Sequence, residues 1–158
     1  DQALKAALLD KKNLKIYSFL SRGSDERQYC SPGVNLPYCS FSKSKEFPEY
    51  HTNKDNFNVV TQKGLLESFD VMKNIIDAFE LELYPRTKII CEPNLGKRKL
   101  YPTISRKGIY NNKIKLRSNL IAYANGTNSI FKISNLSKTN LKETCNEYKL
   151  LKSEKILK

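Results

Sequence analysis

The sequence predicts an α/β unit followed by a small winged-helix-like unit, and three observations support this prediction. Helical and strand-like segments alternate in the first half of the chain, which is typical of an α/β layer with functional loops at strand ends. Three short helical segments and a strand-like end close the chain, in the order found in winged helices. The charge divides at the same place. Residues 1–83 hold 11 Lys and Arg against 12 Asp and Glu, whereas residues 84–158 hold 17 against 4.

The first elements follow from hydrophobic spacing. Residues 2–12 place their apolar side chains on one face at helical spacing, so they predict a helix. Residues 14–20 alternate apolar and polar side chains of strand-forming types, which predicts a β-strand. Residues 34–41 form a second strand-like run, and Pro37 within it indicates an edge or a kink.

The strongest helical pattern in the chain covers residues 58–83. Its apolar side chains recur at intervals of three and four residues; they are Leu65, Leu66, Phe69, Met72, Ile76 and Phe79, with Ile75 and Leu83 alongside. A stripe of this length predicts a helix that packs against a large surface.

Residues 84–116 read as a basic connector, with three prolines, nine basic residues and a single acid, Glu92. We expect a short strand at 87–91 within it, and a course along the surface because long structureless linkers are uncommon in compact domains.

The last part of the chain, residues 117–158, has the pattern of a small winged-helix-like domain. Residues 116–124, 129–134 and 139–151 predict short amphipathic helices, and 154–157 is strand-like. About forty residues is small for an autonomous fold, so we expect this domain to dock onto the first unit.

The composition limits the class of protein. No apolar run approaches the roughly 18 residues that span a bilayer, so we expect no membrane association. Cysteines read as free thiols fit a reducing compartment, so we expect a cytoplasmic location. The four cysteines form no CxxC pair and read as free thiols, although Cys30 and Cys39 could bridge a loop. The chain starts at Asp1 and its single methionine is Met72, which suggests a processed product or a piece of a larger protein.

Polar, acidic and aromatic side chains gather in two turn-rich segments, residues 24–33 and 48–52, and the second contains the only histidine, His51. Zinc sites in proteins use three or four His, Cys or carboxylate ligands, so one histidine cannot supply a two-histidine site within this chain. His51 therefore reads either as one metal ligand or as a hydrogen-bonding surface residue. Asp25 and Glu26 would point in opposite directions if this segment is extended, so one of them is expected to face the site.

Three runs resemble a bacterial aminopeptidase-like family that is related to the zinc aminopeptidases and often found among polysaccharide-biosynthesis genes. They are residues 23–37 (GSDERQYCSPGVNLP), 46–56 (EFPEYHTNKDN) and 91–102 (CEPNLGKRKLYP). The end of the chain resembles the family's C-terminal winged helix, so the resemblance covers nearly the whole chain.

The resemblance implies a fold and a site. The fold would be part of a zinc-aminopeptidase-like three-layer α/β/α unit in residues 1–83, then the connector 84–116 and the winged helix 117–158. His51 matches the histidine of a His-Thr-x-x-Asp motif that binds zinc in the wider family.

The segment that begins at Ser24 resembles a Ser-Asp-His segment that lines the substrate side, which assigns Asp25 and Glu26 to the catalytic cleft. Arg27 and Tyr29 would then contact a small peptide-like substrate. Glu26 replaces the family's histidine, which puts ordinary peptidase activity in doubt.

The leading hypothesis is the C-terminal portion of a zinc-dependent aminopeptidase-like hydrolase acting on peptide or amide bonds. The remaining metal ligands of the family lie upstream of this sequence, so we expect this chain alone to be inactive. Its partner would be the missing N-terminal half or a second copy, with self-association through exposed apolar surface.

The alternative hypothesis is a non-catalytic winged-helix binding module that contacts protein or nucleic acid. Nucleic acid is the weaker of these, because Glu143 and Glu147 accompany Lys142 and Lys149 in the third helix and make a poor face for phosphates.

Overall fold

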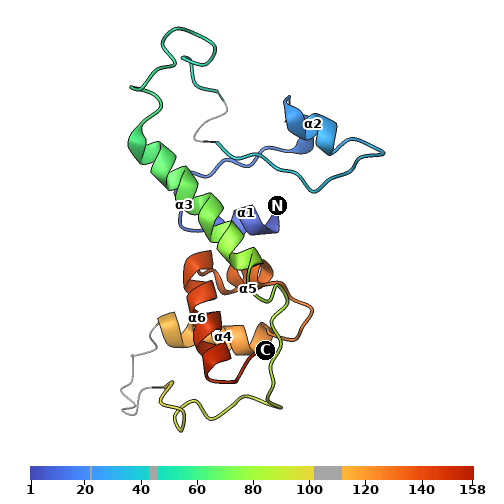
Figure 1. The fold of residues 1–158 in the computed structure, drawn as a ribbon, viewed down its shortest axis with the longest axis vertical. Helices are drawn as coiled ribbons and strands as arrows, with labels where there is room; N and C mark the ends of the chain where they lie inside the picture. The colour runs from blue at the N-terminus through green and yellow to red at the C-terminus, as the bar shows by residue number, and fades with distance from the viewer. Residues whose placement is uncertain (22, 43–45, 102–111) are drawn as a thin grey trace. The chain divides into compact units, whose positions relative to one another are not determined.

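The computed structural model describes residues 1–21, 23–42, 46–101 and 112–158. The elements in chain order are α1 (Gln2–Ala7), the 3₁₀ turn η1 (Phe19–Ser21), α2 (Asp25–Tyr29), α3 (Gln62–Phe79), α4 (Asn112–Tyr123), α5 (Ile130–Ser137) and α6 (Leu141–Ser153) (Figure 1). The chain forms two compact units, one of Asp1 with Lys11–Lys73 and one of Gln2–Asp10 with Asn74–Lys158. Part of the predicted connector, residues 102–111, lies outside the described residues.

The predicted α/β fold, with a three-layer α/β/α unit, is wrong for this chain. The described residues are helical, and their only β pairing consists of two isolated antiparallel bridges, Arg86 with Asn125 and Thr87 with Leu157. Strand preference reflects how well a residue fits beside a neighbouring strand rather than an intrinsic backbone choice. Residues 14–20 and 34–41 have no such neighbour in the described chain, so they stay irregular or form a 3₁₀ turn.

The core lies in the unit of Gln2–Asp10 and Asn74–Lys158, where α5 packs against α1, α4 and α6. The large side chains that are fully enclosed there are Leu120, Ile130, Ile133, Leu141, Tyr148, Leu151, Ile156 and Leu157. Two of the helices begin with side-chain caps. Ser129 accepts a hydrogen bond from the Lys132 amide at 3.1 Å, and Asn140 accepts one from the Lys142 amide at 2.8 Å. Each cap typically stabilises a protein by about 1 kcal/mol.

The N-terminal helix α1 belongs to this core, although it precedes the core's other helices by more than sixty residues. Ala6 and Ala7 are buried, and small side chains of this kind allow close approach to α5. The Asn135 side-chain amide donates to the Gln2 carbonyl at 3.2 Å, and the Asn140 amide donates to Asp10 Oδ2 at 2.9 Å. The helix exists as predicted but ends at Ala7 instead of residue 12.

Residues 86–88 bind the end of the chain through backbone hydrogen bonds. The Lys88 amide donates to the Ile156 carbonyl and the Lys158 amide donates to the Arg86 carbonyl, both at 2.9 Å. The Thr87 amide donates to the Ala124 carbonyl at 2.9 Å. The strands predicted at 87–91 and 154–157 are thereby reduced to single bridges.

Helix α3 confirms the strongest helical prediction, over a shorter range than 58–83. Its apolar stripe does not form a core in the described chain: Leu65, Phe69 and Ile76 are 59%, 63% and 55% exposed. The buried residues of the helix are Val71 and Ala78, seven positions apart and outside that stripe. Phe79, at the end of the stripe, packs its ring against Phe131 at 4.9 Å between centroids, so among the described residues the stripe is covered only at that end.

The unit of Lys11–Lys73 is held by local turns. No described residue from Lys11 to Asp70 is buried.

No helix in the described ranges combines the length and the apolar character needed to cross a bilayer.

Candidate functional site

Four of the predicted site residues lie on one short helix. Ser24 precedes α2 with extended backbone angles, and the acids Asp25 and Glu26 occupy the first turn. There their negative charges interact favourably with the positive end of the helix dipole. The Arg27 amide donates to the Ser24 carbonyl at 2.9 Å and thereby forms the first turn of the helix. The segment is therefore helical rather than extended, and Asp25 and Glu26 do not point in opposite directions.

The two carboxylates of α2 have different surroundings. Asp25 is exposed, whereas Glu26 is partly buried and its Oε2 accepts a hydrogen bond from Ser40 Oγ at 3.4 Å. Ser40 was not among the predicted site residues, and no pattern in the sequence links it to Glu26. Of the two acids, Glu26 is therefore the one whose carboxylate is held in place by a contact outside the helix.

A closed loop supports the end of α2. The Leu36 amide donates to the Tyr29 carbonyl at 2.7 Å, and the Tyr29 and Tyr38 rings lie 5.2 Å apart. Cys30 donates from Sγ to the Tyr38 carbonyl at 3.2 Å, and both Cys30 and Cys39 are free thiols here. The loop therefore fixes Tyr29 beside Tyr38, with the phenol ring about half exposed.

His51 lies in a separate turn. The Thr52 amide and hydroxyl both donate to the Glu49 carbonyl, at 3.0 and 2.6 Å, and close the turn around His51. His51 has a left-handed backbone with φ of 61° and its ring lies 3.9 Å from the Tyr50 ring, centroid to centroid. The imidazole is exposed, so its nitrogens are accessible to a ligand.

The described residues do not form a metal site by themselves. Within the described ranges, no three His, Cys, Asp or Glu side chains come together in a way that could hold a metal ion. Because zinc in proteins takes at least three protein ligands, His51 fits a zinc site only as one contributor.

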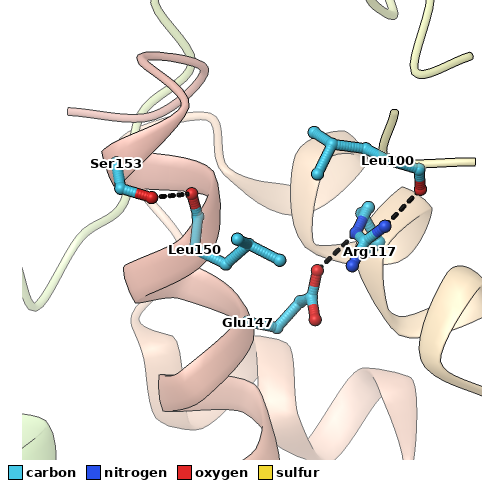
Figure 2. Close-up of polar contacts among 5 residues, drawn as sticks. All are labelled: Leu100, Arg117, Glu147, Leu150 and Ser153. Atoms are coloured by element: carbon cyan, nitrogen blue, oxygen red, sulfur yellow. Dashed lines mark hydrogen bonds and ion pairs between the residues drawn. The ribbon is translucent and has the colours of Figure 1, made fainter. Parts of the chain in front are cut away.

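A more deeply buried polar cluster lies elsewhere among the described residues, and the sequence pattern did not predict it. Arg117 of α4 donates from Nε to Glu147 Oε1 of α6 and from Nη1 to the Leu100 carbonyl (Figure 2). The side chains are 10% and 3% exposed, so the ion pair is nearly dry. The guanidinium of Arg117 and the carboxylate of Glu147 pair with each other, and a buried charge is usually stable only when it is paired in this way. The cluster joins the two helices to the loop that ends at Leu100, a structural role with no sequence signal.

Two family profiles divide the sequence between them. A family described as a domain of unknown function (DUF4910) matches residues 1–82, and a winged helix-turn-helix family matches residues 82–158. The second match agrees with the arrangement of α4, α5 and α6.

Two similar proteins, both from Clostridium acetobutylicum, carry functional names. One is named "Putative polysaccharide biosynthesis protein with aminopeptidase-like domain" and is 40% identical over 95 residues, covering 56% of this chain and 21% of its own length. The other is a crystal structure of a "putative peptidase", 25% identical, with a TM-score of 0.73 over 100% of this chain and 35% of its own. The chain thus spans about a fifth to a third of these relatives, one named for an aminopeptidase-like domain and the other as a putative peptidase.

Proposed function

Because the chain belongs to the family described as a domain of unknown function (DUF4910), and is similar to a protein with an aminopeptidase-like domain and to a putative peptidase, we propose that it is the C-terminal portion of a zinc-dependent hydrolase of peptide or amide bonds. By itself the chain is inactive. The observation that carries the proposal is the similarity along the whole chain to a peptidase-like structure, together with 40% identity to an aminopeptidase-like protein.

Helix α2 would provide the substrate side of the cleft. Glu26, partly buried and hydrogen-bonded by Ser40, is the residue we assign to proton transfer, and the exposed Asp25 lies beside it. Arg27 would bind a carboxylate or carbonyl of the substrate, because a guanidinium offers several donors in a planar fork. Tyr29, fixed by its ring contact with Tyr38, would contact the substrate backbone.

His51 is the proposed zinc ligand of this chain. Its exposure and its closed turn suit a pre-formed donor, but the described residues alone do not hold a metal. At least two further ligands must come from another part of the protein or from another chain.

The partner required by this proposal is the remainder of the aminopeptidase-like domain. The exposed stripe of α3, which includes Leu65, Phe69 and Ile76, is the surface it would cover. Exposed apolar stripes of this size mark interaction surfaces in soluble proteins. Without that partner, two copies of the chain would cover the stripe by associating with each other.

Zinc content and hydrolysis, measured on the natural protein and on the 158-residue chain, test the proposal. We expect the natural protein to hold zinc and to hydrolyse aminoacyl amides, and the chain alone to do neither. A natural protein without zinc or hydrolysis would refute the proposal, and so would hydrolysis by the pure chain.

A matched pair of variants separates His51 from its turn. His51→Asn tolerates the left-handed backbone, since Asn adopts it more readily than most residues, while it removes the imidazole. We expect this variant of the natural protein to lose zinc, and Asn53→Ala, an exposed change in the same turn, to keep it. Equal zinc content in both variants would refute the assignment of His51.

A further inference from the structure

Basic side chains converge on one end of the winged-helix unit. Three separate segments contribute exposed Lys and Arg there, and we name them together the C-terminal basic surface: Arg86, Lys88, Lys97, Arg98, Lys99, Lys152, Lys155 and Lys158. The same segments, residues 86–101 and 152–158, contain two acids, Glu92 and Glu154. The concentration of charge follows from the fold, because the fold brings residues 152–158 beside residues 86–101, which lie more than fifty positions earlier in the sequence.

Hydrogen bonds hold the three segments together. The end of the chain is joined to residues 86–88 by the two backbone bonds described above. On the other side, Arg98 Nη1 donates to the Glu154 carbonyl at 3.0 Å, which attaches the 97–99 loop to the turn after α6. In Figure 1 the segment after residue 85 runs past the C-terminal end of α6.

The loop that carries Lys97, Arg98 and Lys99 is anchored at both ends. Leu95 and Leu100 are buried, and the Leu100 amide donates to the Leu95 carbonyl at 2.9 Å. The buried Arg117 donates a hydrogen bond from Nη1 to the Leu100 carbonyl (Figure 2). The three basic side chains are therefore displayed at the tip of a closed turn, which lowers the entropy that binding would cost.

The exposed face of α6 is less basic than this surface. Lys142 and Lys149 are exposed there together with Glu143. Glu147 is buried against Arg117, so only one of the two acids that argued against nucleic acid lies on the outside. Lys152, in the last turn of α6, donates from Nζ to the Tyr148 hydroxyl at 3.4 Å and belongs to the C-terminal basic surface, so the end of α6 and the turn after it are more basic than the rest of the helix.

We propose that the C-terminal basic surface binds the phosphate backbone of double-stranded nucleic acid. Six of its eight basic side chains are lysine, a residue depleted in protein–protein interfaces and suited as a point charge to phosphate. A membrane-surface helix would need an exposed apolar face, whereas Leu141, Tyr148 and Leu151 of α6 are buried in the core. The inference goes beyond the proposed hydrolase and does not depend on it.

Fluorescence anisotropy with a labelled DNA duplex of mixed sequence tests the proposal on the full chain. Each phosphate contact contributes a slope of about −0.9 to the dependence of log affinity on log salt. With four contacts, affinity should fall by about a hundredfold between 50 and 200 mM salt. Absence of binding at the lower salt concentration would overturn the proposal.

Two triple variants, each removing three exposed charges, locate the surface. Lys97→Gln with Arg98→Gln and Lys99→Gln should weaken binding by at least about tenfold and reduce the salt slope by about 3. Lys132→Gln with Lys142→Gln and Lys149→Gln, on α5 and α6, should leave both quantities close to those of the unchanged chain. Circular dichroism confirms that each variant is folded.

The opposite pattern, with binding lost only in the second variant, would place the contact on α6 and overturn the proposal. Binding to vesicles of anionic lipid but not to the duplex would also overturn it. A second variant of the surface, Lys152→Gln with Lys155→Gln, keeps the test valid if the first variant fails to fold.

Discussion

Removal of the Glu147 carboxylate leaves the Arg117 guanidinium buried without its charged partner. Breaking a buried ion pair from one side typically costs about 3–5 kcal/mol, so Glu147→Ala should lower the free energy of unfolding by about that amount. Urea denaturation followed by circular dichroism measures the change. Glu143→Ala, an exposed acid in the first turn of α6, is the control and should change stability by no more than about 1 kcal/mol, the size of its interaction with the helix dipole. Equal losses in the two variants would show that the pair is not what holds α4 to α6.

Burial also determines the chemistry of Cys145. It raises the pKa of the thiol from 9.0 to about 11; Lys149 opposes this rise and Asp77 adds to it. The thiolate is the reactive form, so Cys145 should be the last of the four cysteines to react with a disulfide reagent at pH 8, and the exposed Cys91 among the first.

The same pKa shift has a consequence for stability. In the folded state the Cys145 thiol keeps its proton to higher pH than in the unfolded chain. The contribution of the buried thiol to the free energy of unfolding is therefore fully present below pH 9.0 and is lost as the pH rises towards 11. Cys145→Ala should remove this pH dependence of the free energy of unfolding. Reaction of Cys145 as fast as that of Cys91 would contradict the enclosure described here.

At the scale of elements, α3 is the helix whose sequence predicts an apolar face but whose apolar side chains are largely exposed among the described residues. The chain should self-associate at micromolar concentration through its apolar stripe. Leu65→Glu with Phe69→Glu should make it monomeric without loss of helical signal, because both side chains are more than half exposed. Sedimentation velocity measures the association, and Lys63→Glu, an exposed position on the same helix away from the stripe, is the control with the same change of charge. A monomeric unchanged chain would refute the prediction.

Elements of this chain were predictable where their stability is local. The helices α3, α5 and α6 were predicted from apolar spacing, at 58–83, 129–134 and 139–151, and the structure has them at 62–79, 130–137 and 141–153. The strands were not, because a strand needs a neighbour that the sequence pattern does not reveal.

The site divides in the same way. The sequence identified the residues of α2 and His51 as candidates, and their roles stay predictions. The contact of Ser40 with Glu26 and the pairing of Arg117 with Glu147 depend on tertiary structure, across 14 and 30 positions, and left no local pattern.

At the scale of the whole molecule, the two units differ in what stabilises them. The enclosed side chains lie in residues 2–10 and 71–158, whereas the described part of residues 11–70 contains none; among the described residues of the Lys11–Lys73 unit, Val71 alone is buried. Backbone amides resist exchange with solvent in proportion to the free energy needed to open the structure around them. Amides of α4, α5 and α6 should therefore exchange slowly, together with those of α1, and amides of residues 11–60 should exchange fast.

Hydrogen exchange followed by mass spectrometry on the full chain measures both classes in one experiment. A truncation that removes residues 1–10 should speed exchange in α5, because it removes Ala6, Ala7 and the two hydrogen bonds from Asn135 and Asn140. If, as proposed, the chain is part of a longer aminopeptidase-like protein whose remaining residues cover this unit, residues 11–60 should become protected in that protein. Strong protection of residues 11–60 in the isolated chain would contradict the division, since it would require a core that the described residues of that unit do not provide.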